Sequence, residues 1–477
     1  MKHRRRAVTV LAVLAAVAVL PGTVGVASAD SVPGYRMANG ATPVKGSPST
    51  VDAPPLSPGL HTDAIKRGEQ KHYAVTLDAR HSAYFSVVAA PQPGTKVEDY
   101  KDKLTVSVQD SNGRTCSTDA TTTFSGGGMA YPIADYASRR IGADRPDCQQ
   151  AGPYYVVVER EGSVTSGPDT WPIELDYLDE PPLKGNTPAQ PGAGTWNTAT
   201  PAPPTDTTKR NAKGGTGFND AGSVATGVWK DRIRPGESRF YRVPVDWGQR
   251  LNLSAELPNS SSGAAGSSRA VADALGLGVY NPARGAVGDD RFVFYDGKQA
   301  VAQQFTAPVD YGNRFNPTGA VGAMRFAGWY YLEVSLHPDA AQFFPKGTEL
   351  TLRVDVRGAA KAGPGYAEPT GTFTVTPEDR EMARNGQTAQ EAERSGTLMT
   401  VAYAGIGTGV MLLIGLGAWT LVARRSAAAA SSGPGTPSAL PTQPTQPTQP
   451  TQPTQPGQPT QSGQQGAPQR QFGPPRG

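Results

Sequence analysis

The sequence is poor in the residues that most often carry catalysis or bind metals. Its 477 residues include two cysteines and five histidines. No histidine has the spacing of a zinc motif such as HExxH, and neither a GxSxG nucleophile elbow nor a GxxxxGK[ST] phosphate loop occurs. We therefore expect no catalytic residue, no metal site and no cofactor, and we predict that the protein is not an enzyme. A hydrolase is the least favoured hypothesis.

The chain also lacks an excess of charge once its first residues are set aside. The formal net charge is +4, and Lys2, Arg4, Arg5 and Arg6 account for all of it, because residues 1–29 hold no acidic residue. Residues 30–477 are therefore neutral. Nucleic-acid binding usually leaves a basic imbalance in the mature chain, so we expect no nucleic-acid partner.

Residues 1–29 have the pattern of a cleavable export signal. The basic start is followed by an apolar run over residues 7–20, and Ala27-Ser28-Ala29 fits the small-residue rule for cleavage before Asp30. The run is shorter than the ~20 residues that a spanning helix needs. We predict cleavage between Ala29 and Asp30; an uncleaved signal anchor is the alternative.

An exported chain reaches an oxidising compartment, where paired cysteines form disulfides. Cys116 and Cys148 are the only cysteines, and we predict that they are bonded to each other. In the chain-entropy model such a bond stabilises the fold by roughly 3–4 kcal/mol.

Residues 398–422 form the one long uncharged apolar run after the signal, and Arg424 and Arg425 follow it. The run is long enough for a transmembrane helix, and the two arginines place its end in the cytoplasm by the positive-inside rule. We predict a single-pass type I protein of the cell membrane. Gly405 and Gly409 have the GxxxG spacing of a helix-dimer face, which leaves a homodimer through the span open; the alternative is that glycine is merely common in spans.

The remaining low-complexity segments predict connectors and a tail. Residues 423–477 contain five Pro-Thr-Gln repeats and few large apolar residues, so we expect a disordered cytoplasmic tail. Thr376-Pro377 resembles a helix N-cap followed by proline at the first helical position. The predicted connecting segments are a linker over 30–59, a Pro-rich linker over 179–222 and a stalk, possibly helical, over 377–397.

Between these connectors the sequence repeats itself. Residues 63–78 match residues 231–246 at a constant offset of 168, with Asp, Ile, Gly, Glu, Tyr, Val and a final Asp in common. Further matches follow in the same order, the last of them pairing Ile173 with Leu352. Equal order with drifting offsets is expected of two copies of one fold with different loops, so we predict domains over 60–178 and 223–376.

The matched segments alternate apolar and polar residues. Tyr73, Val75 and Leu77 point to one side of such a segment, which is the period of a half-buried strand. Gly68 and Gly236 precede these strands, where a turn with positive φ favours glycine. We expect an all-β fold of two tandem β-sandwich domains, followed by the transmembrane helix and the disordered tail.

The repeated motifs resemble the bacterial pre-peptidase C-terminal family. They are Ile-x-x-Gly-Glu-x-x-x-Tyr-x-Val, a strand ending in Asp-Ser-Asn-Gly or Asn-Pro-Ala-Arg-Gly, and Gly-x-Tyr-Tyr-x-x-Val. The resemblance covers roughly residues 60–178 and 225–357. It implies jelly-roll-like β-sandwiches that serve as accessory domains for binding, spacing or export. The Ala-, Gly- and Pro-rich usage is typical of a high-G+C, actinobacterial source.

Two functional hypotheses follow. The favoured one is a surface-displayed pair of interaction modules that acts as an accessory or partner-binding subunit of an unknown membrane or secreted protein. The alternative is an adhesin that binds cell-wall glycan or another polysaccharide. The tryptophans Trp171, Trp196, Trp229, Trp247 and Trp329 could supply stacking surfaces for sugars, although packing in the core or at a strand edge is the favoured role for most of them. Asp289-Asp290 is read as a solvated turn rather than a calcium ligand.

Overall fold

The computed structural model describes residues 31–117, 120–142, 147–185, 208–260, 270–388, 391 and 416–421. Residues 416–421 are helical, and within the described residues no helix has both the length and the apolarity needed to cross a bilayer. The rest of the predicted span 398–422, the cleavage site Ala29/Asp30, Gly405, Gly409, Arg424, Arg425 and the tail 423–477 lie outside the described residues, so these remain predictions.

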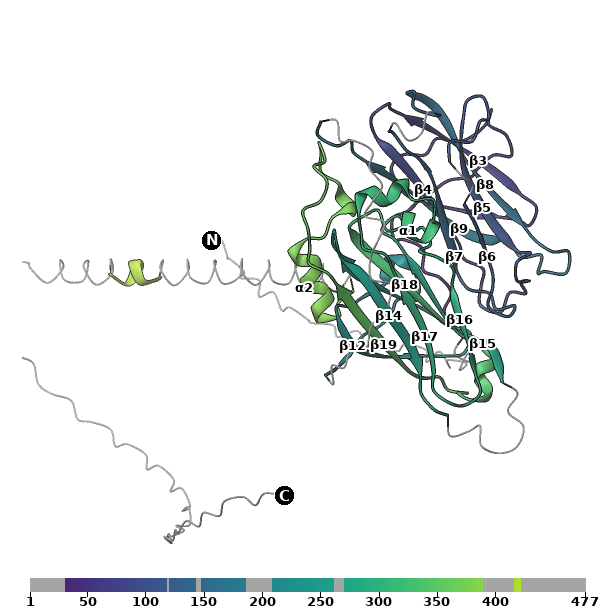
Figure 1. Cartoon of the computed structure of the whole chain (residues 1–477), viewed down its shortest axis with the longest axis vertical. Helices are drawn as coiled ribbons and strands as arrows, with labels where there is room; N and C mark the ends of the chain where they lie inside the picture. Colours follow the sequence, from purple (N-terminus) through teal and green to yellow (C-terminus); the bar gives the residue numbers. More distant parts are fainter. Residues whose placement is uncertain are drawn as a thin grey trace, which may run out of the picture. The chain divides into compact units, whose positions relative to one another are not determined.

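The described fold is all-β, as predicted, and consists of two modules coloured purple to blue and teal to green in Figure 1. Module 1 has two sheets. Sheet 1A is ordered β1 (Thr42–Pro43), β2 (Gly59–Ile65), β9 (Trp171–Glu180), β4 (Ser82–Ala89) and β7 (Ile133–Arg139). Sheet 1B is ordered β3 (Gln70–Leu77), β8 (Gly152–Glu161), β5 (Lys103–Asp110) and β6 (Ala120–Thr123).

Module 2 repeats this topology. Sheet 2A is ordered β10 (Lys209–Asn211), β12 (Gly227–Ile233), β19 (Thr348–Arg357), β14 (Arg250–Leu257) and β17 (Ala300–Phe305). Sheet 2B is ordered β11 (Gly222–Ser223), β13 (Ser238–Val245), β18 (Gly328–Leu336), β15 (Val271–Tyr280) and β16 (Arg291–Tyr295). Adding ten to the numbers of β2 to β9 gives the matching strands of module 2.

Short helices decorate module 2. They are η1 (Phe218–Asp220), η3 (Tyr311–Phe315), α1 (Gly319–Gly322), η4 (Pro338–Gln342), η5 (Gly371–Phe373) and α2 (Pro377–Asn385). Thr376 caps α2 as predicted: its side chain accepts from the Asp379 amide, and Gly386 ends the helix at φ 67°. Helix α2 ends at Asn385 and is docked on module 2; in the rest of the predicted stalk 377–397, residue 391 is helical, and residues 389, 390 and 392–397 lie outside the described residues.

The repeated motif builds the same polar junction twice. The Asp63 carboxylate accepts hydrogen bonds from the Tyr73 hydroxyl (2.9 Å) and the Gly46 amide (2.8 Å). In module 2 Asp231 accepts from Tyr241 at 2.7 Å and from Gly214 at 2.7 Å. Both tyrosines are fully buried, and a buried hydroxyl needs a partner. The shared Asp and Tyr therefore lock the opening strands of each sandwich together.

The turn before β3 and β13 is also conserved between the copies. Gly68 and Gly236 have φ of 74° and 82°, which confirms the predicted positive-φ turns. Glu69 accepts from the Lys66 amide at 2.6 Å, and Glu237 accepts from the Arg234 amide at 2.8 Å. The glutamates therefore close one turn in each module rather than forming a carboxylate pair.

Strand pairing corrects one of the sequence matches. Asp63 faces Ile173 in sheet 1A, and its counterpart Asp231 faces Leu350 in sheet 2A. Ile173 thus corresponds to Leu350, not to Leu352. A shift of two residues keeps every side chain on the same face of a strand, so the alternation of apolar residues did not reveal the error.

Two predicted linkers are partly folded, which corrects their boundaries. Within 30–59, Thr42–Pro43 pair in parallel with β2, Ser47 bridges His72 and Leu56 is buried. Within 179–222, β9 extends to Glu180 and residues 209–223 supply β10, η1 and β11, while 186–207 lie outside the described residues. Added edge strands pair exposed backbone groups, so these Pro- and Gly-containing segments close sheet edges.

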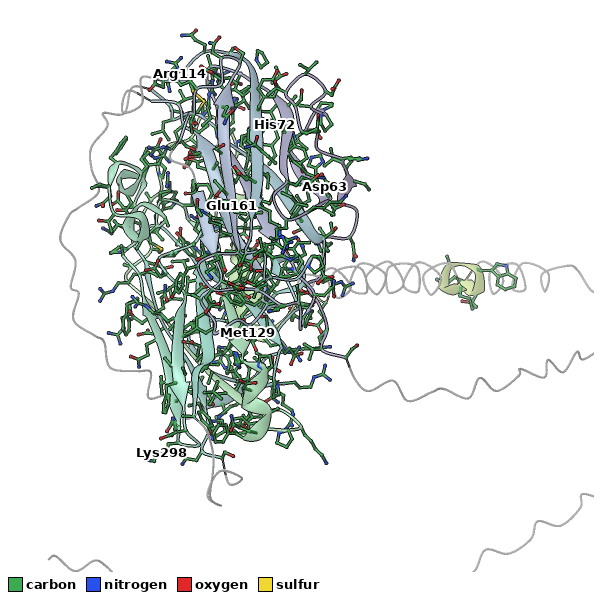
Figure 2. The ribbon with its side chains drawn as sticks, turned by 90° about the vertical axis from the view of Figure 1, so that its right-hand side faces the viewer. Asp63, His72, Arg114, Met129, Glu161 and Lys298 are labelled. Carbon is green, nitrogen blue, oxygen red and sulfur yellow. A yellow bond between two sulfur atoms is a disulfide. The ribbon has the colours of Figure 1, made fainter. Side chains whose placement is uncertain are left out.

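The disulfide prediction is confirmed. Cys116 and Cys148 are bonded, with a Cα–Cα distance of 5.6 Å, and both half-cystines are buried in the core of module 1. Arg114, two residues before Cys116, is labelled in Figure 2 and marks the end of module 1 that carries the disulfide. Module 2 contains no cysteine, so the two copies differ in covalent reinforcement.

Candidate binding surfaces

The outer face of sheet 1A is covered by module 2. Tyr84 of β4 packs edge-on against Phe326 and Phe373, with ring centroids 5.0 and 5.9 Å apart. A second apolar cluster joins Val88 and Ala134 of module 1 to Phe218 and other residues of module 2. These side chains are buried, and apolar burial of this kind is the main favourable term in holding two surfaces together.

Two buried ion pairs cross the same boundary. Arg314 of module 2 contacts Glu180 of module 1 at 2.5 Å, and their side chains are 4% and 2% exposed. Burial alone would raise the pKa of Glu180, but the Arg314 guanidinium and the hydroxyls of Tyr84 and Tyr366 lower it below its usual value. Such a pair is costly to break, because removing one partner leaves a buried charge uncompensated.

The second ion pair joins Arg284 to Glu174 at 2.5 Å, with Asp176 3.7 Å away. Arg284 has φ of 60°, and the hairpin register makes Gly113, at φ 77°, its counterpart in module 1. The left-handed conformation costs a residue with a Cβ about 1–2 kcal/mol. Module 2 therefore holds an arginine in a conformation that favours glycine, and the guanidinium lies on the acidic face of module 1.

The matching face of sheet 2A carries different residues, and several of them, among them Glu256 and Thr351, are buried. Across the boundary, module 1 presents Tyr84, Val88 and Leu178, and the strand registers give Asn252, Glu256 and Asp355 as their counterparts. Glu174, Asp176 and Glu180 are likewise replaced by Thr351, Arg353 and Arg357. The apolar and acidic docking face of module 1 has thus become a polar face of mixed charge in module 2.

The charges on sheet 2A pair with one another. Arg353 contacts Glu256 at 2.5 Å, Lys230 contacts Glu349 and lies 2.6 Å from the Thr351 hydroxyl, and Arg357 contacts Asp355. On β17 itself the Val301 and Phe305 side chains are 36% and 44% exposed. The face therefore combines fixed hydrogen-bonding groups with one exposed aromatic ring at its edge.

This face holds a cleft of about 510 Å³. Val228, Leu257 and Pro258 supply its apolar part. Its polar lining consists of Lys209, Lys230, Glu256, Asn259, Gln299, Glu349, Thr351 and Arg353. Lys298, labelled in Figure 2, lies in the turn that leads to Gln299. A cleft lined by amide, carboxylate, ammonium and guanidinium groups suits a ligand rich in hydrogen-bond donors and acceptors.

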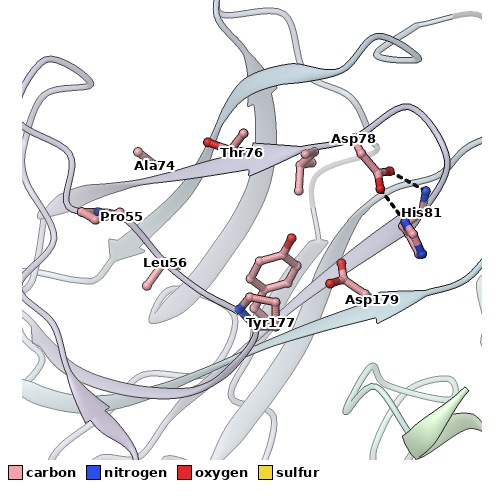
Figure 3. A pocket seen from close by; sticks show the side chains of 10 residues that line it. Pro55, Leu56, Ala74, Thr76, Asp78, His81, Tyr177 and Asp179 are labelled. Atoms are coloured by element: carbon pink, nitrogen blue, oxygen red, sulfur yellow. Dashed lines mark hydrogen bonds and ion pairs between the residues drawn. The ribbon is translucent and has the colours of Figure 1, made fainter. Parts of the chain in front are cut away.

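A second pocket, of about 360 Å³, lies on module 1 at the end of β3 (Figure 3). Asp78 and His81 line one side, and their side chains form a hydrogen bond of 2.5 Å. Burial alone would raise the pKa of Asp78, but the amides of His81 and Arg80 and the His81 ring lower it to about 2. Tyr177 and Asp179 of β9 line the other side, and burial raises the pKa of Asp179.

The structure answers several questions about candidate residues. Trp171 and Trp229 are 1% exposed and Trp247 is 8% exposed, so they pack in the cores, as favoured, and supply no sugar-stacking surface; Trp196 lies outside the described residues.

Asp290 is not the solvated turn residue that we expected. It accepts a hydrogen bond from Tyr131 of module 1 at 3.3 Å, and burial raises its pKa to about 6. Within the described residues, no three His, Cys, Asp or Glu side chains gather closely enough to hold a metal ion.

Sequence reasoning missed Arg284, Arg314 and the polar face of sheet 2A. One signal was available for Arg284, because Asp-Ser-Asn-Gly in module 1 matches Asn-Pro-Ala-Arg in module 2. An arginine in place of the glycine of a hairpin turn is unusual where φ is positive. Nothing in the sequence distinguished the outer face of sheet 2A from any solvent-facing strand surface.

No protein-family model matches the chain, and no curated protein matches it. Among solved structures, the tandem CBM22 domains of Paenibacillus barcinonensis Xyn10C are 10% identical, with 62% of this chain and 91% of that one covered and a TM-score of 0.16. The CUB1-EGF-CUB2 domain of human MASP-1/3 is 8% identical, covering 62% and 99%, with a TM-score of 0.15. The tandem CBM51 modules of a Streptococcus pneumoniae family 98 glycoside hydrolase are 8% identical, covering 62% and 83%, with a TM-score of 0.16. These TM-scores are too low to assign the chain to any of the three folds or functions.

Proposed function

We propose that this protein is a non-catalytic surface protein that binds a hydroxyl-rich glycan, such as a cell-wall polysaccharide, on the outer face of sheet 2A. One observation carries the proposal. The face that module 1 uses to hold module 2 carries, in module 2, a cleft of about 510 Å³ with a polar lining. The chain would reach the surface through the predicted signal over 1–29 and be anchored by the predicted span over 398–422.

The chemistry of the cleft favours a glycan over other ligands. Its charged groups are of both signs, and Lys230 and Arg353 are paired with Glu349 and Glu256, so the cleft does not provide the one-signed field that steers nucleic acid. Paired side chains are also held in place, which reduces the entropy lost when they bind a ligand. On the same face of sheet 2A, outside the cleft, Phe305 of β17 is 44% exposed and supplies an apolar ring face that a longer glycan can cover.

A retention experiment tests this proposal. The full-length protein in detergent micelles is applied to purified cell wall, and the double variant Lys230→Ala/Glu349→Ala is compared with wild type. Removing both partners avoids an unpaired charge. We expect the apparent affinity to fall at least about tenfold, which corresponds to about 1.4 kcal/mol.

The matched control is Lys103→Ala/Glu161→Ala, which removes a similarly exposed inter-strand pair (2.9 Å) from sheet 1B. It should retain the wild-type affinity. Equal retention of both double variants, or no retention of the wild type on cell wall and soluble polysaccharides, would refute glycan binding by this face. The membership in the pre-peptidase C-terminal family that the motifs suggest remains a prediction.

A further inference from the structure

On module 2 the helix α2 packs on the outer side of sheet 2B. We call the surface that it contacts, which includes Ser223, Arg242 and Asp246, the seat of α2. Arg380 of α2 contacts Asp246 at 2.6 Å, and the Asp379 carboxylate accepts from the Trp329 indole at 3.0 Å. Just after the helix, the Gln387 carbonyl accepts from the Ser223 amide at 3.2 Å. The Met382 sulfur accepts from the Arg242 guanidinium. The seat therefore combines an acidic residue at the end of β13 with backbone and side-chain contacts from β11 and β13.

The internal repeat locates the same seat on module 1. The constant offset of 168 makes Pro55, Ala74 and Asp78 the counterparts of Ser223, Arg242 and Asp246, and the shared bridges of β3 and β13 confirm this register. All three counterparts line the pocket of about 360 Å³ in Figure 3. The pocket of module 1 thus overlaps the place that α2 occupies on module 2, although Pro153, the counterpart of Trp329, does not line it.

Two carboxylates line this pocket; the Asp78 carboxylate already accepts from the amides of Arg80 and His81 and from the His81 ring, so an incoming basic group would share it with His81. Asp78 corresponds to the carboxylate that holds Arg380, and Asp179 adds a second carboxylate. Glu368 of module 2 lies 3.5 Å from His81 and 3.2 Å from Arg80 at its border. Ala74 is much smaller than Arg242, its counterpart on module 2, and Thr76 is exposed, so a side chain of an incoming segment has room next to Asp78.

We propose that the pocket lined by Asp78 and Asp179 is a docking site for a short helical segment of a partner protein that carries an arginine, in the way that α2 docks on module 2. The arginine of the segment contacts Asp78, as Arg380 contacts Asp246, and its helix lies along the outer side of β3. This site is separate from the glycan face and does not depend on it. It gives the chain one surface for a polysaccharide and one for a protein.

The test uses a defined probe, a fluorescent peptide of residues 375–388, which contains α2 with its N-cap and Arg380. Its binding to the full-length protein in detergent micelles is measured by fluorescence anisotropy. We expect saturable binding to one site. Asp78→Asn should weaken binding at least about tenfold, and so should the Arg380→Gln substitution within the peptide, because each removes one partner of a charge-assisted contact.

Two further variants keep the result interpretable. Thr76→Trp fills the pocket from its exposed side without altering Asp78 and should also abolish binding. Asp246→Asn alters only the seat of the protein's own α2 and should leave the peptide affinity unchanged. Circular dichroism checks that each variant is folded.

Absence of saturable binding up to about 1 mM peptide, the weak limit of ordinary affinities, would overturn the proposal. So would equal binding to wild type, Asp78→Asn and Thr76→Trp, or loss of binding only in Asp246→Asn. Retention of the same preparations on cell wall is measured in parallel, so that failure of this site and failure of the glycan face are told apart.

Discussion

Sheets 1A and 2A have the same strand order, but their outer faces differ in residues and in what covers them. In module 1 the face is acidic and aromatic and is buried under module 2, whereas in module 2 it is polar and internally paired and carries a cleft. Three acidic residues on β9 have Thr351, Arg353 and Arg357 as counterparts on β19. A few substitutions on one face thus turn a duplicated sandwich from a docking surface into an accessible one.

The largest expected effect comes from breaking a boundary ion pair. Glu180→Ala leaves the buried Arg314 without its carboxylate, and we expect the free energy of unfolding to fall by about 3–5 kcal/mol. Glu349→Ala on the open face should cost less than about 1 kcal/mol, because its partner Lys230 keeps access to water. Urea denaturation followed by tryptophan fluorescence measures both; equal losses would contradict the distinction between a closed and an open face.

The disulfide allows the stabilities of the two modules to be compared, because only module 1 contains one. Reduction of Cys116–Cys148 should destabilise module 1 by roughly 3–4 kcal/mol, and module 2 has no such bond to lose. Hydrogen exchange read by mass spectrometry should show faster exchange in β5 and β8 after reduction, with β15 and β18 much less affected. An equal increase in both modules would mean that the boundary makes them unfold as one unit.

The half-buried Asp290 tests how charge contributes to the stability of the boundary. Burial raises the pKa of Asp290 to about 6 from its usual 3.8, so the folded state favours the protonated form and loses stability as pH rises from about 4 through about 6. Asp290→Asn keeps an acceptor for Tyr131 and removes this loss. We expect a gain of about 1–2 kcal/mol at pH 8 and almost none at pH 4.

The control for this pH dependence is Glu180, whose pKa is lowered in the folded state. Its contribution is present above the ordinary carboxyl pKa and is lost as pH falls, which is the opposite sign. A stability gain of Asp290→Asn that is as large at pH 4 as at pH 8 would show that the effect does not come from titration.

The smallest effect separates backbone strain from charge at Arg284. Arg284→Ala and Arg284→Gly both remove the contact with Glu174, but glycine also removes the cost of φ 60°. We expect both variants to be less stable than wild type and the glycine variant to be more stable than the alanine variant by about 1 kcal/mol. Thermal unfolding ranks the three proteins; equal stability of the two variants would mean that the turn relaxes.

Most of the fold was accessible from the sequence because local patterns decide it. The alternation of Tyr73, Val75 and Leu77, the glycines at 68 and 236, the cap at Thr376 and the paired cysteines each have a local cause. The match of Ile173 failed by two residues because a period of two fixes the face but not the register.

The candidate sites were not accessible in the same way. Whether Glu180 or Arg357 lies under another module depends on packing between segments far apart in the chain, and both residues continue a polar-apolar alternation. The pocket at Asp78 is recognisable only after its counterpart on module 2 is seen to hold Arg380. Duplication supplied the comparison that made both sites visible.

The most direct measurement is hydroxyl-radical footprinting of the full-length protein with and without soluble cell-wall polysaccharide. Our account predicts that Tyr84, under the boundary, stays unmodified in both samples, and that Phe305 on the open face is modified alone and protected by the polysaccharide. Modification of Tyr84 in the free protein, or unchanged modification of Phe305 in the presence of a polysaccharide that binds, would contradict it.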